Sequence, residues 1–538
     1  MKRRASLFLI SIALVMAVRI NGLSQTYTNL HSMGSSSGDP QHPEYAGVIA
    51  QGRDGNLYSS TAFGGLAHGA VFKITPAGAL TVLHSFSTSE GYAAYGGVTM
   101  GTDGNFYGTT LSGGTSNDGT IFKITPAGVL TTLYNFTGGT DGKNPYAPPV
   151  QGTDGTFYGT TSLGGSSGYG VVYKITASGV FTPLYQFDNT HGYYPTSALF
   201  QSTDGNWYGV TLLGGTSSHG TAFRITTAGK LTVLYNFGSS GSQPYGPLAH
   251  APDGNFYGTT QVGGASNNGV IYKLTPGGVY TVLHEFSTDG ASPYGGLVVA
   301  TDNNLYGMTY SGAASSYGSL YKITAAGVFT KLHDFALADG ANPAITPIQH
   351  TDGTIFGDTY GGGSAGAGVF FSLSASLKAY AGLVTSAARV GTSIGILGQG
   401  LNGTTSVAFN GKPSSFTISS DTFLTATVPS GATGGVVTVK TATGTLTSNV
   451  KFRVIPAIKS FSPTSGPVGT SVTITGTSFT GATRVAFGGV LSTSFTVNSD
   501  TGVTAVVPTG AVTGKITIAT PGGTATSTAS FTVTTTLE

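Results

Sequence analysis

The hydrophobic positions of residues 26–377 fall into short runs separated by glycine-rich turns, and no stretch shows a sustained helical period. Residues 95–144 read YGGVTMG, a TDGN turn, FYGTTL, a polar loop SGGTSNDG, TIFKIT, a PAG turn and VLTTLYNF. Short runs rich in β-branched and aromatic residues, bounded by turn residues, predict four antiparallel strands joined as a meander. The Asp-Gly pair predicts a two-residue hairpin turn between the first two strands.

The stretch TDGNFYGTT, residues 102–110, has six further copies along the chain. The leading acids of the copies are 49–51 residues apart: Asp54, Asp103, Asp154, Asp204, Asp253, Asp302 and Asp352. So regular a period predicts a repeat architecture. Four meandering strands in about 50 residues are typical of one blade of a β-propeller.

The motif of the fourth strand occurs six times after these turns, for example LTTLYNF at 130–136. The seventh period lacks it, and the missing copy, TYTNLHSM, stands at 26–33, before the first turn. An open solenoid has no reason to divide one repeat between its ends, whereas a ring does, because the first strand then closes the last blade. Residues 25–377 are therefore predicted to form a seven-bladed β-propeller closed by the N-terminal strand.

The 50-residue period stops after residue 377, and two copies of another unit follow. VGTSIGILGQGL (390–401) aligns with VGTSVTITGTSF (468–479), and SVAFNGK (406–412) aligns with RVAFGGV (484–490). Short alternating strands between Gly, Pro and Asn turns predict two immunoglobulin-like β-sandwiches, at 378–454 and 455–538. The expected fold class is all-β throughout.

The N-terminus combines a basic MKRR, a 12-residue apolar run at 7–18 and a small-residue site ending at Ser24. This pattern predicts a secretory signal peptide over residues 1–24. A membrane anchor would need about 20 apolar residues. We therefore expect an extracellular or cell-surface protein with no transmembrane segment after cleavage.

Charged residues make up only 8% of the chain, so its surface must consist mainly of hydroxyl, amide and glycine groups. Residues 1–24 hold four of the 23 basic residues and no acid, which leaves 19 basic against 21 acidic side chains after cleavage. No basic patch argues for nucleic acid. The absence of cysteine excludes disulfides and thiol chemistry.

The repeated acids are interpreted as turn residues, because Asp caps backbone groups there and calcium loops need several oxygen ligands close together. His31, His84, His284 and His333 share one fourth-strand position with Tyr134, Tyr185 and Tyr235, which indicates a common packing or hydrogen-bonding role. We expect no metal and no cofactor. Departures from the repeat, such as Asp358 and Trp207, show no paired carboxylates or Ser-His-Asp set with local support, so no catalytic residue is assigned.

Candidate ligand-binding residues lie in the connections between strands two and three and between strands four and one, which share one face of a propeller. One set precedes the recurring Gly of the first connection: His68, Asp118, Tyr169, His219, Asn268 and Tyr317, with Ala367 in the last copy. A second set precedes the first strand: Tyr45, Tyr95, Tyr146, Tyr245 and Tyr294, with Thr196 and Ala344 as exceptions. Aromatic faces with polar tips suit sugars or peptides, and packing between blades is the alternative interpretation.

Two resemblances add to this. Residues 456–534, with SFSPTSGPVGTSVTITGTSF followed by VAFGG, resemble an IPT/TIG domain, and 379–454 is similar without the SPTSGP opening. The 50-residue repeats, DGNFYGTT to LTTLYNF, resemble the GloVer repeats of bacterial secreted proteins. The first resemblance implies a binding, spacer or scaffolding role without catalytic residues, and the second implies no specific activity.

We expect an exported, monomeric, non-enzymatic binding or adhesion protein, or surface scaffold, whose propeller face recognises a polysaccharide or a cell-surface protein. An extracellular carbohydrate-active enzyme, a hydrolase or lyase with accessory immunoglobulin-like modules, is the alternative. A purely structural surface protein is a third possibility.

Overall fold

A computed structural model describes residues 25–44 and 47–535. The predicted signal peptide, residues 1–24, lies outside the described residues. Within them the regular structure is almost entirely β, and the helical turns are two short 3₁₀ segments, η1 (Asn189–His191) and η2 (Leu401–Gly403). The described residues contain no helix long and apolar enough to cross a membrane.

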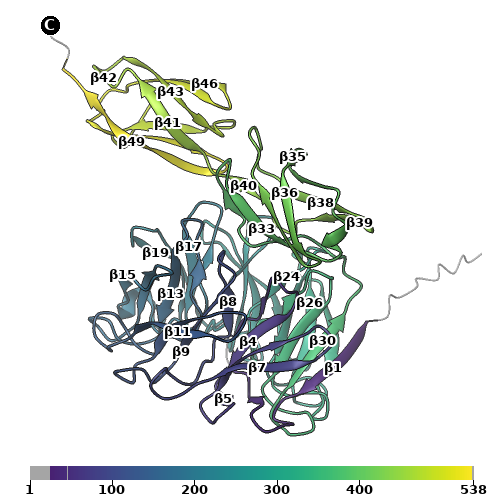
Figure 1. Ribbon diagram of the computed structural model, residues 1–538. Coiled ribbons are helices and arrows are strands. Elements are labelled where there is room, and N and C mark those ends of the chain that lie inside the picture. Colours follow the sequence, from purple (N-terminus) through teal and green to yellow (C-terminus); the bar gives the residue numbers. More distant parts are fainter. Residues whose placement is uncertain (1–24, 45–46, 536–538) are drawn as a thin grey trace, which may run out of the picture.

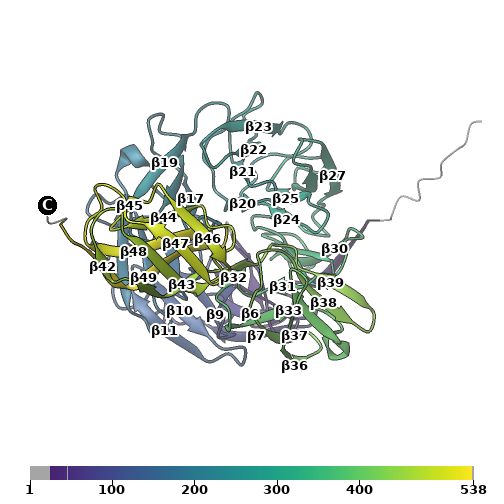
Figure 2. The ribbon, with the colours of Figure 1, turned by 90° about the horizontal axis from the view of Figure 1, so that it is seen from above.

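Seven four-stranded antiparallel sheets occupy the described residues between 26 and 374, and Figure 2 shows them following one another in a propeller-like arrangement. The first three comprise β3 (Ala50–Gln51), β4 (Leu57–Thr61), β6 (Ala70–Ile74) and β7 (Leu80–Ser85); β8 (Val98–Met100), β9 (Phe106–Thr110), β10 (Thr120–Ile124) and β11 (Leu130–Asn135); and β12 (Val150–Gln151), β13 (Phe157–Thr161), β14 (Val171–Ile175) and β15 (Phe181–Gln186). The next three comprise β16 (Phe200–Gln201), β17 (Trp207–Thr211), β18 (Thr221–Ile225) and β19 (Leu231–Asn236); β20 (Ala249–His250), β21 (Phe256–Thr260), β22 (Val270–Leu274) and β23 (Tyr280–Glu285); and β24 (Val298–Val299), β25 (Leu305–Thr309), β26 (Ser319–Ile323) and β27 (Phe329–Asp334). The strands match the predicted meander.

The seventh sheet combines both ends of the repeat region. It consists of β28 (Ile348–Gln349), β29 (Ile355–Thr359), β30 (Val369–Ser374) and the N-terminal β1 (Thr26–Ser32). Strand β1 pairs antiparallel with β30. Tyr27 of β1 also stacks on His333 of the sixth sheet at 3.9 Å between ring centroids. The N-terminal copy of the fourth-strand motif thus takes the place that the seventh period leaves open.

The prediction that the Asp-Gly turns are two-residue hairpin turns is wrong. In the second sheet Gly104 donates to the carbonyl of Gly101 at 2.9 Å, and Gly101 donates to that of Asn105 at 2.8 Å, so three residues form the loop. Only the residue after the acid has a positive φ, +85° at Gly104. The Asp103 carboxylate accepts the amide of Asn105 at 3.0 Å and the hydroxyl of Tyr107 at 2.8 Å. This side-chain cap stabilises the longer turn.

The capping role predicted for the acids is confirmed in all seven described turns, where each aspartate accepts the amide two residues on at 2.7–3.2 Å. The tyrosine that bonds the acid also packs between sheets. Tyr107 lies 3.9 Å from Phe157 of the next sheet, and Tyr158 stacks on Trp207 at 4.4 Å. Trp207 therefore replaces Phe in a shared core position.

Two β-sandwiches follow the seven sheets. In the first, β31 (Gly382–Leu383), β33 (Ser393–Leu397), β37 (Phe423–Thr427) and β36 (Phe416–Ser420) face β35 (Lys412–Ser414), β34 (Ser406–Phe409), β38 (Val437–Thr441) and β39 (Gly444–Thr447), and β32 (Ala387–Ala388) pairs with β40 (Arg453–Val454). In the second, β41 (Ala457–Ser462), β43 (Ser471–Thr477), β47 (Gly502–Val506) and β46 (Phe495–Ser499) face β42 (Ser465–Gly466), β49 (Gly523–Val533), β48 (Gly514–Thr520), β44 (Arg484–Phe487) and β45 (Val490–Leu491). Each sandwich encloses its own apolar core.

Both sandwiches lie at the same end of the seven sheets (Figure 1). This end carries the Asp-Gly turns. Thr422 of the first sandwich donates to the carbonyl of Arg53 at 2.7 Å, and the Arg53 guanidinium lies 4.6 Å from the Phe423 ring centroid. Arg453 donates to the carbonyl of Thr203 at 2.8 Å. The first sandwich therefore covers part of the turn end, and both sandwiches leave the opposite end uncovered.

Candidate functional site

The connections between strands two and three and between strands four and one form the end of the sheets opposite the sandwiches (Figure 1). We call this end the loop face. In each repeat, one non-glycine residue just before the first strand has a positive φ, between +49° and +62°. The seven residues are His42, Ala93, Asn144, Tyr194, Gln243, Ser292 and Asn342. This conformation turns the chain inward toward the short first strand.

Backbone hydrogen bonds link the first predicted set of site residues to the segments that carry the second set two residues further on. The amide of each positive-φ residue donates to the carbonyl of the predicted position in the preceding connection. The pairs are Ala93 to His68, Asn144 to Asp118, Tyr194 to Tyr169, Gln243 to His219, Ser292 to Asn268, Asn342 to Tyr317 and His42 to Ala367. The first set thus lies beside the second across the boundary between neighbouring sheets.

The side chains of the first set are half-buried, and Ala367 is buried. His68 lies 5.8 Å from Tyr92 and Tyr169 lies 5.1 Å from Tyr193, measured between ring centroids. Asn268 donates to the carbonyl of Ser287 at 3.2 Å. His219 bonds the carbonyl of Ser217, the Asp118 carboxylate lies beside Gly138, and Tyr317 packs on the core of the last sheets. Most of these side chains are therefore anchored locally.

The tyrosines of the second set gather into two arcs on the loop face. In one arc Tyr146 lies 5.8 Å from Tyr95 and 5.9 Å from Tyr194, and its hydroxyl lies 3.1 Å from that of Tyr194. In the other, Tyr294 lies 5.4 Å from Tyr245 and 4.9 Å from Tyr310. The structure thus brings together four of the predicted tyrosines and adds Tyr194 and Tyr310.

Tyr45, the first tyrosine predicted for this set, lies outside the described residues. The backbone assigns the equivalent place to Glu44, because it stands two residues after His42, as Tyr95 stands two residues after Ala93. Glu44 is 8% exposed and accepts a hydrogen bond from Tyr95. Burial raises the pKa of Glu44 to about 7, although the Tyr95 bond acts to lower it. Glu44 thus places a buried carboxyl group where four other repeats carry a tyrosine.

Carboxylates that the sequence analysis did not single out pair with the fourth-strand His and Tyr. The histidine Nε2 lies within 3.4 Å of a carboxylate in His31–Asp39, His84–Glu90, His284–Asp289 and His333–Asp339. Tyr134 donates to Asp141 at 3.0 Å in the same way. Each acid is in the following connection, where Glu90 also accepts the Ser87 amide. His84, His284, His333 and Tyr134 form hydrogen bonds, whereas His31 Nε2 has none among the described residues and Tyr235 packs its ring on Tyr280. The common packing or hydrogen-bonding role predicted for this position therefore divides between the two.

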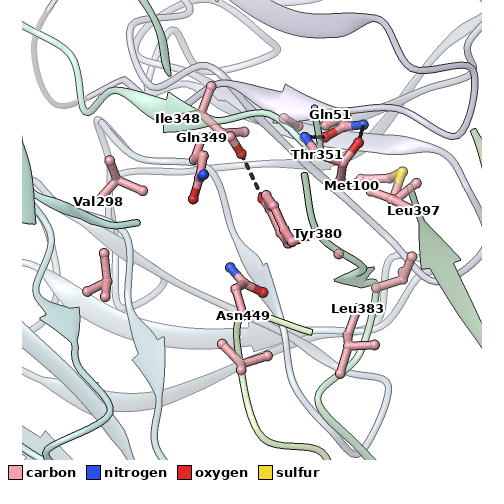
Figure 3. A pocket seen from close by; sticks show the side chains of 15 residues that line it. Gln51, Met100, Val298, Ile348, Gln349, Thr351, Tyr380, Leu383, Leu397 and Asn449 are labelled. Atoms are coloured by element: carbon pink, nitrogen blue, oxygen red, sulfur yellow. Dashed lines mark hydrogen bonds between the residues drawn. The ribbon is translucent and has the colours of Figure 1, made fainter. Parts of the chain in front are cut away.

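A pocket of about 400 Å³ lies at the other end, between the inner strands and the first sandwich (Figure 3). Val298, Ile348 and Leu383 contribute apolar walls. The Tyr380 hydroxyl donates to the carbonyl of Gln349 at 2.7 Å, and Thr351 exchanges hydrogen bonds with Gln51. The Gln51–Thr351 bonds join the first and seventh sheets, and the Tyr380 bond and a bond from Gln399 to Thr351 join the sheets to the segment that begins the sandwich. Among the residues that the structure describes, no group of three or more His, Cys, Asp or Glu side chains could hold a metal ion.

Fold and site together define an all-β repeat protein with propeller-like sheets, an aromatic loop face and terminal immunoglobulin-like domains. The chain belongs to the Gloeobacter/Verrucomicrobia repeat family, whose model matches residues 16–148 and 137–299. The IPT/TIG domain model matches residues 456–534. No curated protein matches the sequence.

Several solved structures are similar at low identity. A fungal alcohol oxidase of the AA5 family in complex with copper is 16% identical over 77% of this chain and 98% of its own, with a TM-score of 0.44. A putative 6-phosphogluconolactonase from Bacteroides fragilis is 18% identical over 58% and 88%, with a TM-score of 0.40. A surface glycan-binding protein from Prevotella bryantii is 21% identical over 27% and 38%, with a TM-score of 0.21. At this level the similarities say nothing of activity.

Proposed function

We propose that this is an exported, monomeric binding protein without enzymatic activity, whose loop face recognises a glycan or a protein at the cell surface or outside the cell. Its ligand-binding body, residues 25–377, is a seven-bladed β-propeller closed by β1. The sandwiches at 378–454 and 455–538 act as spacers or secondary contacts, and residues 1–24 direct export.

The observation that carries this proposal is the position of the two tyrosine arcs. They lie on the end that the sandwiches leave uncovered, whereas the Asp-Gly turns at the other end contact Thr422 and Arg453. Tyrosine combines a flat apolar ring with a hydroxyl, so a row of half-buried tyrosines offers both stacking and hydrogen bonding at small entropic cost.

The test is binding of the purified protein to a glycan array and to surface proteins, followed by product analysis of every glycan that binds. We expect binding without turnover, and we expect Tyr146→Ala to weaken it about tenfold or more. Tyr280→Ala is a useful control, because Tyr280 packs its ring on Tyr235 in the fourth strands. Cleavage of a bound polysaccharide would contradict the proposal and support a hydrolase or lyase.

A further inference from the structure

The loop face departs most from the repeat where the first and seventh sheets meet, a region that we call the seam. Here β2 (Pro40–Gln41) pairs with β5 (Phe63–Gly64) as a small extra ribbon. The ribbon presents Phe63, 43% exposed, and the adjoining loop presents Leu66, 79% exposed. The other repeats carry Thr, Ser or Ala at the position of Leu66: Thr115, Ser166, Thr216, Ala265, Ala314 and Ser364. A large apolar side chain thus replaces small ones at this position in the first repeat alone.

Two further rings complete the seam surface. The His42 ring lies 6.1 Å from Phe63 and 4.8 Å from Tyr360, between centroids. His42 Nδ1 lies 2.9 Å from the carbonyl of Tyr360. Because a carbonyl only accepts, Nδ1 carries the proton, and Nε2 of the neutral ring is then a hydrogen-bond acceptor. The ring orientation is therefore fixed by a backbone contact.

Glu44 adds a carboxyl group to these rings. It accepts a hydrogen bond from Tyr95. Burial raises the pKa of Tyr360, and the nearby charge of Glu44 acts in the same direction. The seam thus offers two aromatic faces, Phe63 and Tyr360, beside a phenol hydroxyl, an imidazole acceptor and a carboxyl group. Flat apolar faces next to a few convergent polar groups are the usual composition of a small-molecule or sugar-binding surface.

The charge of the seam restricts the class of ligand. Residues 39–44, 60–69, 91–97 and 358–368, which form it, contain no Lys or Arg. An acidic polysaccharide or a phosphorylated ligand would find no Lys or Arg partner there. Uncharged sugars have apolar C–H faces for the rings and hydroxyl donors for His42 and Glu44.

We propose, building on the proposed function, that the seam residues His42, Glu44, Phe63 and Tyr360 form a subsite for pyranose units of a neutral polysaccharide. Phe63 and Tyr360 contact the apolar sugar faces. His42 and Glu44 accept hydrogen bonds from sugar hydroxyls. Leu66 borders the subsite on its exposed side.

Affinity gel electrophoresis of the full chain tests this inference. The probes are galactomannan, mixed-linkage β-glucan, xylan and dextran as neutral polymers, with polygalacturonate and alginate as acidic ones. We expect at least one neutral polymer to retard the protein, and we expect Phe63→Ala and Tyr360→Ala to weaken that interaction about tenfold or more. Val129→Ala is the control and leaves the interaction unchanged, because Val129 is an apolar side chain, 64% exposed, in a turn between strands three and four, away from the loop face. Thermal unfolding of each variant verifies that it is folded.

The outcomes separate the two proposals. Retardation by a neutral polymer that is lost in Tyr146→Ala but kept in Phe63→Ala and Tyr360→Ala overturns the seam subsite and leaves the binding function standing. Retardation by acidic polymers only, or by none while a surface protein binds the loop face, also overturns the neutral-polysaccharide assignment. Binding of no glycan and no protein overturns both proposals.

Discussion

Three buried tyrosine hydroxyls show where the repeat tolerates a local loss of folding free energy. Tyr173, Tyr272 and Tyr321 occupy the centre of third strands in which other repeats carry Phe. Their hydroxyls are fully buried and lack a hydrogen-bond partner within the described residues. A buried polar group without a partner lowers the stability of the folded state, because no hydrogen bond offsets the free energy of removing it from water. Tyr107 is different, because its hydroxyl bonds the Asp103 carboxylate at 2.8 Å.

Removing these two kinds of hydroxyl should have opposite effects. We expect Tyr173→Phe to raise the free energy of unfolding by about 1–3 kcal/mol, since it removes an unsatisfied group without changing the ring. Tyr107→Phe should lower it by about 1.5–3 kcal/mol, since a hydrogen bond to a charged acceptor is lost. Urea denaturation at pH 7 measures both, and equal effects of the two substitutions would contradict this interpretation.

Asp358 is the residue-scale departure with the strongest electrostatic consequence. It is fully buried in β29, and neither carboxyl oxygen has a hydrogen-bond partner among the described residues. Burial raises its pKa to about 8. Four of the other repeats place Thr or Ser there, and two place Val210 and Met308. Thr259, for example, donates to the carbonyl of Gly295 at 2.9 Å. A buried acid in the last sheet therefore replaces an uncharged side chain.

The raised pKa makes stability depend on pH in a defined direction. Between the usual Asp pKa near 3.8 and about 8, the folded chain holds a proton on Asp358 that the unfolded chain releases. Stability therefore falls as pH rises through this window and levels off above it. We expect Asp358→Thr to stabilise the protein more at pH 8 than at pH 5, measured by thermal unfolding. A gain that is the same at both pH values would refute the assignment.

At the scale of elements, the strands could be predicted from the sequence because each repeat carries turn residues that mark where its strands begin and end. The acid, the following Gly and the FY pair fix the turn and second strand, and the structure places them within a residue or two of expectation. The turn type was missed, because the Asp103 side chain supports a loop one residue longer than the favoured hairpin. Local side-chain capping is not visible in the spacing of hydrophobic positions.

The site was predicted less completely than the strands. Tyr194 stands at a position that is His, Ala, Asn, Gln or Ser in the other repeats. Tyr310 and Tyr360 share a position that is Ala, Leu, Ser or Gln in the first five repeats, so no pattern common to all repeats marks these tyrosines. The first copy also differs in spacing: Glu44 stands ten residues before Asp54, whereas Tyr95 stands eight before Asp103. The positive φ of His42 resolves this, and only the folded backbone reveals it.

Strand β1 is the element on which the integrity of the repeat region should depend most. Met33 just after it is fully buried, and the Tyr27 hydroxyl donates to the carbonyl of Asp339 at 2.6 Å. If β1 closes a ring, deleting residues 25–33 exposes the edge of β30 and removes these contacts. We expect the Tm to fall by about 10 °C or more. An unchanged Tm in calorimetry would refute closure.

At the scale of the whole molecule, the two ends of the sheets have different tasks. The turn end is occupied by the first sandwich, through Tyr380, Gln399 and Thr422. The loop end bears the tyrosine arcs and the seam. Sequence analysis could identify both sandwiches but could not show which end they cover, because that depends on surfaces assembled from residues more than 300 positions apart, such as Arg53 and Thr422.

Hydrogen-exchange mass spectrometry with a bound ligand tests the central claim that recognition occurs on the loop face. We predict slower exchange in residues 91–97, 141–147 and 290–296, which hold Tyr95, Tyr146 and Tyr294 of the tyrosine arcs, and in 40–44 and 62–68 at the seam. The Asp-Gly turns, such as 102–105, and the pocket segment 447–451 should exchange at their unliganded rates. Protection confined to the turns or to the pocket beneath the first sandwich would contradict the account.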